Sequence, residues 1–268
     1  MLIQTPVYNI FFNSIVNNGR NVVECPLAYD GEQYEMDFEA LEEKLSDPQT
    51  SLMILCNPHN PVGRIWERET LARVGELCEK YHVTVLSDEI HCDITRPGTG
   101  YLPFAAASET CKNISVTCIA PTKAFNIAGI QTAAVMIPNE ALHHKVWRAL
   151  NTDEVAEPNV FAIGAAIAAF TKGEDWLEEL RAYLFRKPCI HDRLYPKRDS
   201  AVESDRGRCD LPSVGGLQCA RMQRERTCRC DPQNDRSLCV GRRAVRKNRR
   251  TVFTHQPGMP EKPDRGWL

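Results

Sequence analysis

The residue best placed to do chemistry is Lys123, in the segment APTKAFNIAGIQ that spans Ala120–Gln131. It follows a short β-branched run ending at Ile119 and precedes several small residues, which predicts a position where a strand passes into a loop. Partial desolvation at such an edge lowers the pKa of a lysine and frees its lone pair for Schiff-base chemistry. Taken alone, a solvated loop lysine explains the pattern better, so the assignment depends on residues upstream.

Two further polar motifs follow predicted strands. Asn60 lies in the segment 57–63 (NPHNPVG), whose prolines and glycine predict a tight turn that holds its amide rigidly. Asp88 follows the apolar run Val83–Leu86, and a carboxylate there is costly unless it faces a cation. A purely structural turn stays open for the first motif. For the second, a helix cap or a metal site that includes His91 stays open.

The chain up to residue 187 alternates strand-like and helix-like segments. The predicted strands are Val22–Leu27, Ser51–Cys56, Val83–Leu86, Ile114–Ile119 and Thr132–Ile137. The predicted helices are Asp37–Leu45, Glu67–Tyr81, Glu140–Asn151, Asn159–Thr171 and Asp175–Phe185. This alternation predicts an α/β fold with a mostly parallel sheet and helices on both faces, which binds ligands at the carboxyl ends of its strands.

An amide, a carboxylate and a lysine at three such strand ends fit one ligand, a pyridoxal 5′-phosphate (PLP) ring. Lys123 would form the Schiff base with its aldehyde, and Asp88 would pair with the pyridinium nitrogen and keep the ring an electron sink. The amide of Asn60 would donate a hydrogen bond to the phenolate oxygen.

The motifs NPHNPVG, SDEIH and APTKAFNIAG, in this order and at these intervals, closely resemble the class I/II aminotransferase superfamily of fold type I. In detail they resemble its cystathionine β-lyase (C–S lyase) branch, over about residues 2–186. The resemblance implies the same roles for Lys123, Asp88 and Asn60. It also implies a homodimer that acts on a small amino-acid substrate.

Four more residues take roles from this resemblance. His91 stands where many relatives have a tyrosine contacting the phenolate oxygen, and Tyr8 matches an aromatic that stacks on the ring, although a plain core tyrosine stays open. Thr122 is expected to contact the phosphate. Gln131 occupies the position of a phosphate-binding arginine in typical aminotransferases, which favours the lyase branch because that branch departs there too.

The chemistry implied is a C–S β-lyase, in which freed Lys123 removes the Cα proton and a thiol leaves from Cβ, giving pyruvate and ammonia. Transamination by the same machinery is the first alternative. A non-catalytic fragment is the second.

Composition sets further bounds. The chain has 268 residues and no apolar run long enough for a membrane span, and its start lacks a signal peptide, so we expect a cytoplasmic protein. We interpret Cys56, Cys78 and Cys118, among its twelve cysteines, as reduced core thiols. Relative to the family, we expect the chain to lack an N-terminal segment with a glycine turn that cradles the phosphate.

From Pro188 onward the chain turns from acidic to basic and loses all periodicity. Its cysteines lack paired spacing, which argues against a zinc module. We interpret 188–268 as a disordered tail, with a basic nucleic-acid arm at Arg242–Arg250 as the alternative that we favour least. Moving the frame by one nucleotide through Gly207–Ala220 and His255–Leu268 permits strings that resemble the family's small C-terminal domain. We therefore hypothesise a frameshift near Arg186, which the coding DNA tests.

Overall fold

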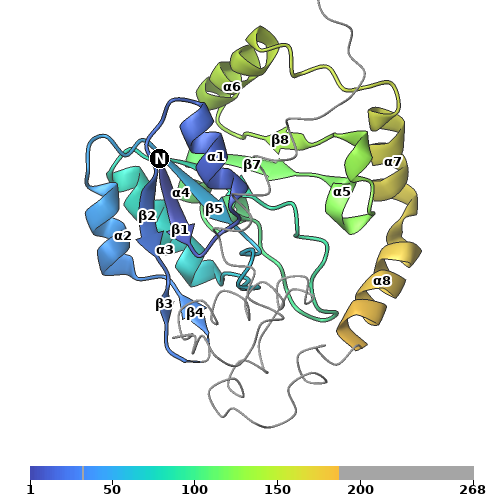
Figure 1. The fold of residues 1–268 in the computed structure, drawn as a ribbon, viewed down its shortest axis with the longest axis horizontal. Coiled ribbons are helices and arrows are strands. Elements are labelled where there is room, and N and C mark those ends of the chain that lie inside the picture. The colour runs from blue at the N-terminus through green and yellow to red at the C-terminus, as the bar shows by residue number, and fades with distance from the viewer. Residues whose placement is uncertain (32, 187–268) are drawn as a thin grey trace, which may run out of the picture. The chain divides into compact units, whose positions relative to one another are not determined.

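A computed structural model describes residues 1–31 and 33–186, all within one compact unit. Figure 1 shows an α/β arrangement, which confirms the predicted class. The predictions for 188–268 lie outside the described residues. The main sheet has the order β2-β1-β5-β6-β7-β8, formed by β2 (Val23–Pro26), β1 (Leu2–Thr5), β5 (Leu52–Cys56), β6 (Thr84–Asp88), β7 (Ser115–Ile119) and β8 (Ala134–Met136).

All neighbouring strands in this sheet are parallel except the pair β7–β8, which is antiparallel. A separate antiparallel ribbon joins β3 (Ala28–Tyr29) to β4 (Tyr34–Glu35). Each predicted strand is present, with ends that differ from the prediction by at most two residues. The sequence pattern therefore places the sheet well.

The helices include three that periodicity did not predict, α1 (Ile10–Asn17), α4 (Glu109–Ile114) and α5 (Pro121–Ala124). The predicted ones are α2 (Phe38–Leu45), α3 (Arg68–Lys80), α6 (Glu140–Thr152), α7 (Ala162–Lys172) and α8 (Glu174–Arg186). The elements η1 (Phe104–Ala106) and η2 (Ala128–Ile130) are one-turn 3₁₀ helices. In the part of the chain that the structure describes, no helix is both long and apolar enough to span a bilayer.

The core has two parts, one on each face of the sheet. Because side chains alternate along a strand, Met53 and Leu55 of β5 face one cluster, and Ile54 and Cys56 face the other. The first cluster contains residues of α2, α3 and α4, among them Leu41, Leu71, Val74 and Cys111. The second contains Ile15 of α1. The strands β1 and β5 are thus covered on both faces, as predicted.

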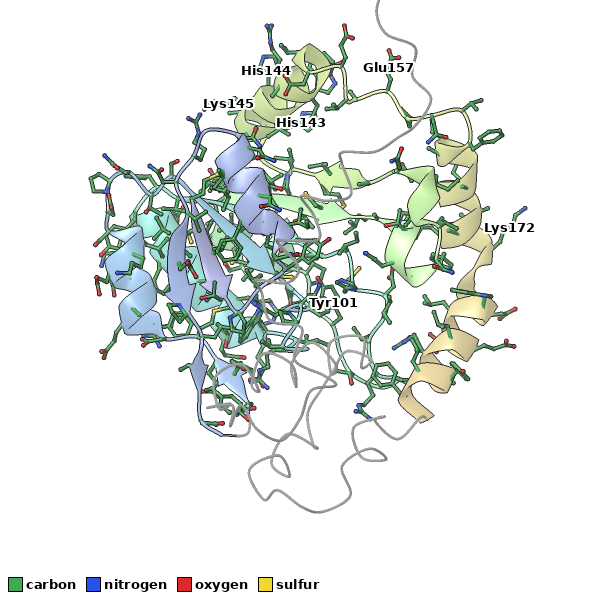
Figure 2. The ribbon with its side chains drawn as sticks, viewed as in Figure 1. Tyr101, His143, His144, Lys145, Glu157 and Lys172 are labelled. Atoms are coloured by element: carbon green, nitrogen blue, oxygen red, sulfur yellow. The ribbon has the colours of Figure 1, made fainter. Side chains whose placement is uncertain are left out.

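The far edge of the sheet differs from this expectation. Within residues 1–186, all three residues of β8 are exposed. Helix α6 exposes Trp147, as well as the polar side chains His143, His144 and Lys145 labelled in Figure 2. Helix α7 and the residues before it expose large apolar side chains, namely Val160, Phe161, Ile163, Ile167 and Phe170.

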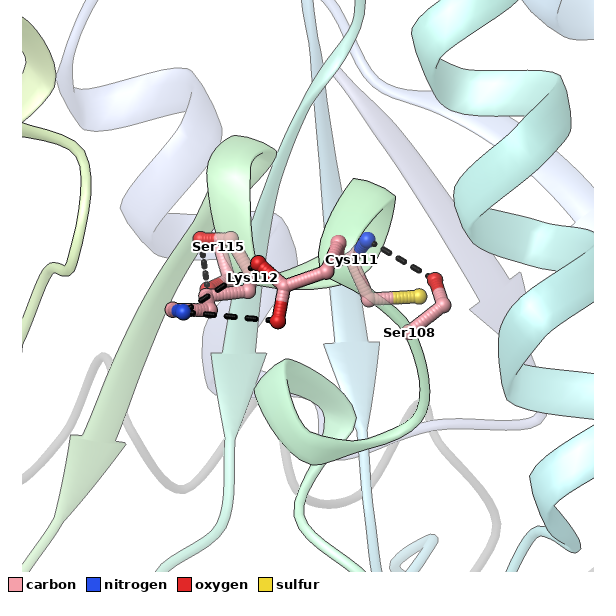
Figure 3. A network of polar contacts seen from close by, with 5 residues as sticks. Ser108, Cys111, Lys112 and Ser115 are labelled. Carbon is pink, nitrogen blue, oxygen red and sulfur yellow. Dashed lines mark hydrogen bonds and ion pairs between the residues drawn. The ribbon is translucent and has the colours of Figure 1, made fainter.

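Helix α4 leads the chain into β7, the strand that precedes Lys123. Figure 3 shows its local contacts: Ser108 Oγ accepts a hydrogen bond from the Cys111 amide (3.1 Å), and Lys112 pairs with the Glu109 carboxylate (3.2 Å). Ser115 Oγ donates to the Lys112 carbonyl oxygen (3.2 Å) where the helix ends. The cap and the final hydroxyl together define both ends of this short helix.

Helix α4 packs closely on α3 at Gly75. A Cβ atom at Gly75 would lie 2.4 Å from the buried Cys111 Sγ, but 3.6 Å from the Cys111 Cβ. Only the sulfur therefore conflicts with a side chain at this position.

We predict that Gly75→Ala lowers the free energy of unfolding by about 1–3 kcal/mol because of this overlap. Adding Cys111→Ala removes the sulfur and should recover most of the loss. Gly164→Ala is the matched control, since Gly164 lies within α7 and a Cβ there meets no atom within 4 Å. It should be neutral or stabilise by up to about 1 kcal/mol. Urea unfolding compares the three variants with the wild type, and equal effects of Gly75→Ala and Gly164→Ala would contradict the packing argument.

A buried histidine connects the end of β1 to the turn after β5. The ring of His59 lies edge-on to Trp66, with centroids 5.7 Å apart, and its Nε2 is 3.0 Å from the Pro6 carbonyl oxygen. Because a carbonyl only accepts, Nε2 carries the proton. Burial lowers the pKa of His59 from 6.5 to about 4, so the ring is neutral at pH 7.

This lowered pKa predicts acid sensitivity. Between about pH 6.5 and pH 4 the unfolded chain binds a proton at residue 59 that the folded chain does not, so stability falls as the pH falls, by up to about 3 kcal/mol. His59→Gln keeps an N–H donor for the Pro6 carbonyl but does not titrate. Its stability should therefore change less over this interval in thermal melts. Identical pH dependence in the two proteins would exclude His59 as the cause.

Candidate cofactor site

The three predicted motifs leave the sheet side by side. Strands β5, β6 and β7 are parallel neighbours, and Cys56, Asp88 and Cys118 are paired in register across them. Beyond the last pairs, the Asn57 amide donates to the Asp88 carbonyl oxygen (3.0 Å), and the Glu89 amide donates to the Cys118 carbonyl oxygen (2.9 Å). The segments that follow the three strands therefore start from one edge of the sheet.

Asp88 is a partly buried carboxylate at this edge. Burial raises its pKa, whereas a hydrogen bond from the Ile90 amide (3.2 Å to Oδ1) and the positive charge of Lys123 lower it. The same lysine acts on His91. The pKa of His91 is lowered to about 4, mainly by burial and further by the charge of Lys123. The structure thus brings together a carboxylate, an amine and a neutral imidazole.

Lys123 lies in α5, the single helical turn that follows β7, rather than in a loop. Pro121 occupies the first turn of α5, where its missing amide proton costs nothing. The turn buries Pro121 and Ala124 and leaves the Lys123 side chain exposed. The predicted partial desolvation of the amine is not seen in the described residues, because the Lys123 side chain is exposed.

Asn60 lies at the tip of the predicted tight turn, which is present. The His59 amide donates to the Arg64 carbonyl oxygen, and the Gly63 amide donates to the His59 carbonyl oxygen, both at 2.7 Å. Gly63 has a φ of 77°, a conformation that glycine adopts without strain. The Asn60 backbone amide lies 3.4 Å from Cys56 Sγ, and its side chain is half-buried.

The other three predicted site residues are placed less directly. Tyr8 is exposed and lies edge-on to Phe11, with centroids 5.8 Å apart, so the alternative of a core tyrosine is wrong. Thr122 is half-buried in α5, and Gln131 is exposed with a left-handed φ of 52°. Thr122 directly precedes Lys123 in the chain, whereas Tyr8 and Gln131 make no hydrogen bond or ring contact with Asp88 or Lys123 among the described residues.

Two helices brace the segments that carry Lys123 and His91. Phe125, two residues after Lys123, stacks on Trp176 of α8 (5.6 Å between centroids) and lies edge-on to Phe170 of α7 (6.3 Å). Arg181 of α8 donates from Nε to the Thr95 carbonyl oxygen (2.8 Å), in the segment that follows His91. Sequence reasoning missed this brace, because it joins residues far apart in the chain.

Sequence reasoning also missed two residues beside the site, Glu89 and Asn57. Glu89 is a carboxyl group with 1% exposure, next to Asp88, and Asn57 is fully buried at the start of the Asn60 turn. The signal was present, since both are polar residues directly after apolar strands. Among residues 1–31 and 33–186, no group of three or more His, Cys, Asp or Glu side chains is arranged to hold a metal ion.

The comparisons with known proteins agree on one family. The family model described as aminotransferase class I and II matches residues 1–187. The chain is 47% identical over 184 residues to cystathionine beta-lyase PatB of Bacillus subtilis, which covers 69% of this chain and 48% of that protein. It is 33% identical to protein MalY of Escherichia coli, covering 69% of this chain and 47% of that protein.

Solved structures give the same result. The PLP-bound C-S lyase from Staphylococcus hominis has 39% identity and a TM-score of 0.63, covering 68% of this chain and 46% of that one. Cystalysin from Treponema denticola has 29% identity and a TM-score of 0.66, covering 72% and 48%. This chain therefore spans about half the length of the relatives that it matches. With the family model matching more than half of the chain, the protein belongs to the class I and II aminotransferase family.

Proposed function

We propose that this chain carries the PLP-binding part of a C–S β-lyase. The observation that supports the proposal most is the meeting of Asp88, His91 and Lys123 at adjacent strand ends, linked by the electrostatic effect of the lysine on both partners. The similarity to cystathionine beta-lyase PatB and to the Staphylococcus hominis C-S lyase favours the same conclusion.

The groups present fit PLP chemically. Asp88 has a pKa raised by burial and lowered by a nearby cation, so a pyridinium N–H would stabilise its charged form further. Asn60 and the neutral His91 are able to donate hydrogen bonds to a phenolate oxygen without adding positive charge. The Tyr8 ring is exposed and is therefore accessible for stacking on the cofactor ring. Thr122 and Gln131 are the proposed phosphate contacts.

In this proposal Lys123 has two tasks. Its exposed amine would hold the cofactor through the aldehyde group, and as a free base it would take the Cα proton of a bound amino acid. Bound PLP supplies an electron sink for the charge left at Cα. Asp88 would keep the proton on the ring nitrogen. A partly buried carboxylate attracts a neighbouring positive charge more strongly than one in water does.

A thiol or thioether at Cβ would then leave, which gives a lyase. Typical aminotransferases have an arginine where this chain has the neutral Gln131, which favours this outcome over transamination. The similarity to cystathionine beta-lyase PatB favours it too. Transamination is the second candidate, because aspartate/prephenate aminotransferase of Aquifex aeolicus also matches, at 27% identity.

We predict that PLP added to the purified chain gives a visible absorbance band that borohydride traps on Lys123. Lys123→Ala should abolish the trapped adduct, because no other residue is proposed to bind the aldehyde. Lys112→Ala is the matched control, since Lys112 pairs with Glu109 on the surface of α4. Peptide mapping by mass spectrometry locates the adduct. Trapping that survives Lys123→Ala would contradict the assignment.

We also predict that the PLP-loaded chain converts L-cystathionine to a thiol, pyruvate and ammonia, and that a 2-oxo acid does not accelerate the reaction. Asp88→Asn should lower kcat by about 10²-fold or more, because the ring nitrogen loses its anionic partner. Turnover that requires a 2-oxo acid would favour the aminotransferase. A trapped adduct without any turnover would favour the non-catalytic fragment.

A further inference from the structure

Glu89 is a buried carboxyl group whose oxygens accept hydrogen bonds from two different segments. Oε1 accepts hydrogen bonds from Ser87 Oγ (2.8 Å) and from the Phe104 amide (3.0 Å), and Oε2 accepts one from the Tyr101 hydroxyl. Ser87 belongs to β6, whereas Tyr101 and Phe104 belong to the segment that leads to α4. Glu89 therefore fastens the end of β6 to the segment 101–104.

Tyr101, labelled in Figure 2, extends this connection to a second strand end. Its hydroxyl also lies 3.2 Å from the Asn57 carbonyl oxygen, so its one proton is shared between two acceptors. Burial and the charge of Glu89 raise the pKa of Tyr101, so the phenol keeps that proton and remains a donor.

Asn57 completes the arrangement with its side chain. Nδ2 donates to the Leu102 carbonyl oxygen (3.0 Å), and Oδ1 accepts from the Trp66 amide (3.2 Å). Its backbone amide also donates to the Asp88 carbonyl oxygen (3.0 Å). The segment 101–104 is thus hydrogen-bonded to the residue that begins the Asn60 turn and to the residue that follows Asp88.

We propose that Glu89, Tyr101 and Asn57 form a buried clamp that holds the Asn60 turn and the Asp88 strand end at a fixed separation, as positioning residues for a ring bound between them. The clamp touches neither substrate nor ring. It acts because Glu89 is covalently next to Asp88 and Asn57 is three residues before Asn60. The ring-positioning half of this proposal rests on the function proposed above, and the coupling of the two turns does not.

The test uses the full chain and the variants Glu89→Ala, Tyr101→Phe and Glu89→Gln. Removing a clamp hydrogen bond should speed amide hydrogen exchange in residues 57–63 and 88–91 by about fivefold in the protein without PLP. Glu89→Gln should stay close to the wild type, because its oxygen still accepts from Ser87 and Phe104 while its amide donates to Tyr101. The Tyr101 proton is then free for Asn57.

The matched control is Tyr81→Phe, which removes a phenol hydroxyl that donates to Glu42, before the amino end of β6 and not at the carboxyl end that carries the site. Its exchange in both segments should equal that of the wild type. With PLP present, Glu89→Ala and Tyr101→Phe should also weaken cofactor binding about fivefold and move the pH midpoint of its visible band. A residue with a merely structural role would leave that midpoint unchanged.

The outcomes separate the two proposals. If the wild type binds no PLP, the proposed function fails, while the exchange comparison still decides whether the two turns are coupled. The clamp fails if exchange in both segments is unchanged, if it rises equally throughout α2 and α3, or if Glu89→Gln behaves like Glu89→Ala. It also fails if the visible band titrates identically in all variants of a chain that binds PLP.

Discussion

The parallel pairing of β5, β6 and β7 is the constraint on which the site depends. Asn60, Asp88 and Lys123 are far apart in the chain, and only the in-register pairing of Cys56, Asp88 and Cys118 brings their segments to one edge. A shift of one residue would turn the Asp88 side chain to the opposite face of the sheet. The two apolar clusters oppose this shift, because it would move Val85 out of the first cluster and Leu86 away from the second.

The charges at this edge are arranged around one lysine. Lys123 favours the charged form of Asp88 and the neutral form of His91, so a single exposed amine sets opposite protonation tendencies in its two neighbours. Burial also favours the neutral form of His91, but it disfavours the charged form of Asp88. A ligand that brings an N–H cation to Asp88 would therefore offset the cost of burying its carboxylate.

Sequence patterns predicted the parts of the structure that periodicity and topology determine. The runs around Met53 and Val85 predicted the central strands, and the rule that parallel strands bind ligands at their carboxyl ends predicted that Asp88 and Lys123 approach each other. Helices α4 and α5 were missed because six and four residues are too few to show a helical period. Helix α1 has eight residues, as many as α2, but its consecutive apolar residues Ile10, Phe11 and Phe12 show no clear helical period. The exposure of β8 was missed because a sequence pattern predicts a strand but not which elements pack against its faces.

The reason why the sequence did not predict the clamp is different. Tyr101 follows an irregular segment rich in glycine and proline, and nothing local fixes where such a segment returns to the sheet. Its position matters because neither of the proposed phosphate contacts, Thr122 and Gln131, carries a charge. In the proposed site these two residues would give the phosphate hydrogen bonds but no ion pair. The proposed ring contacts depend on the separation of Asn60 and Asp88, which is the quantity that the proposed clamp of Glu89 and Tyr101 would control.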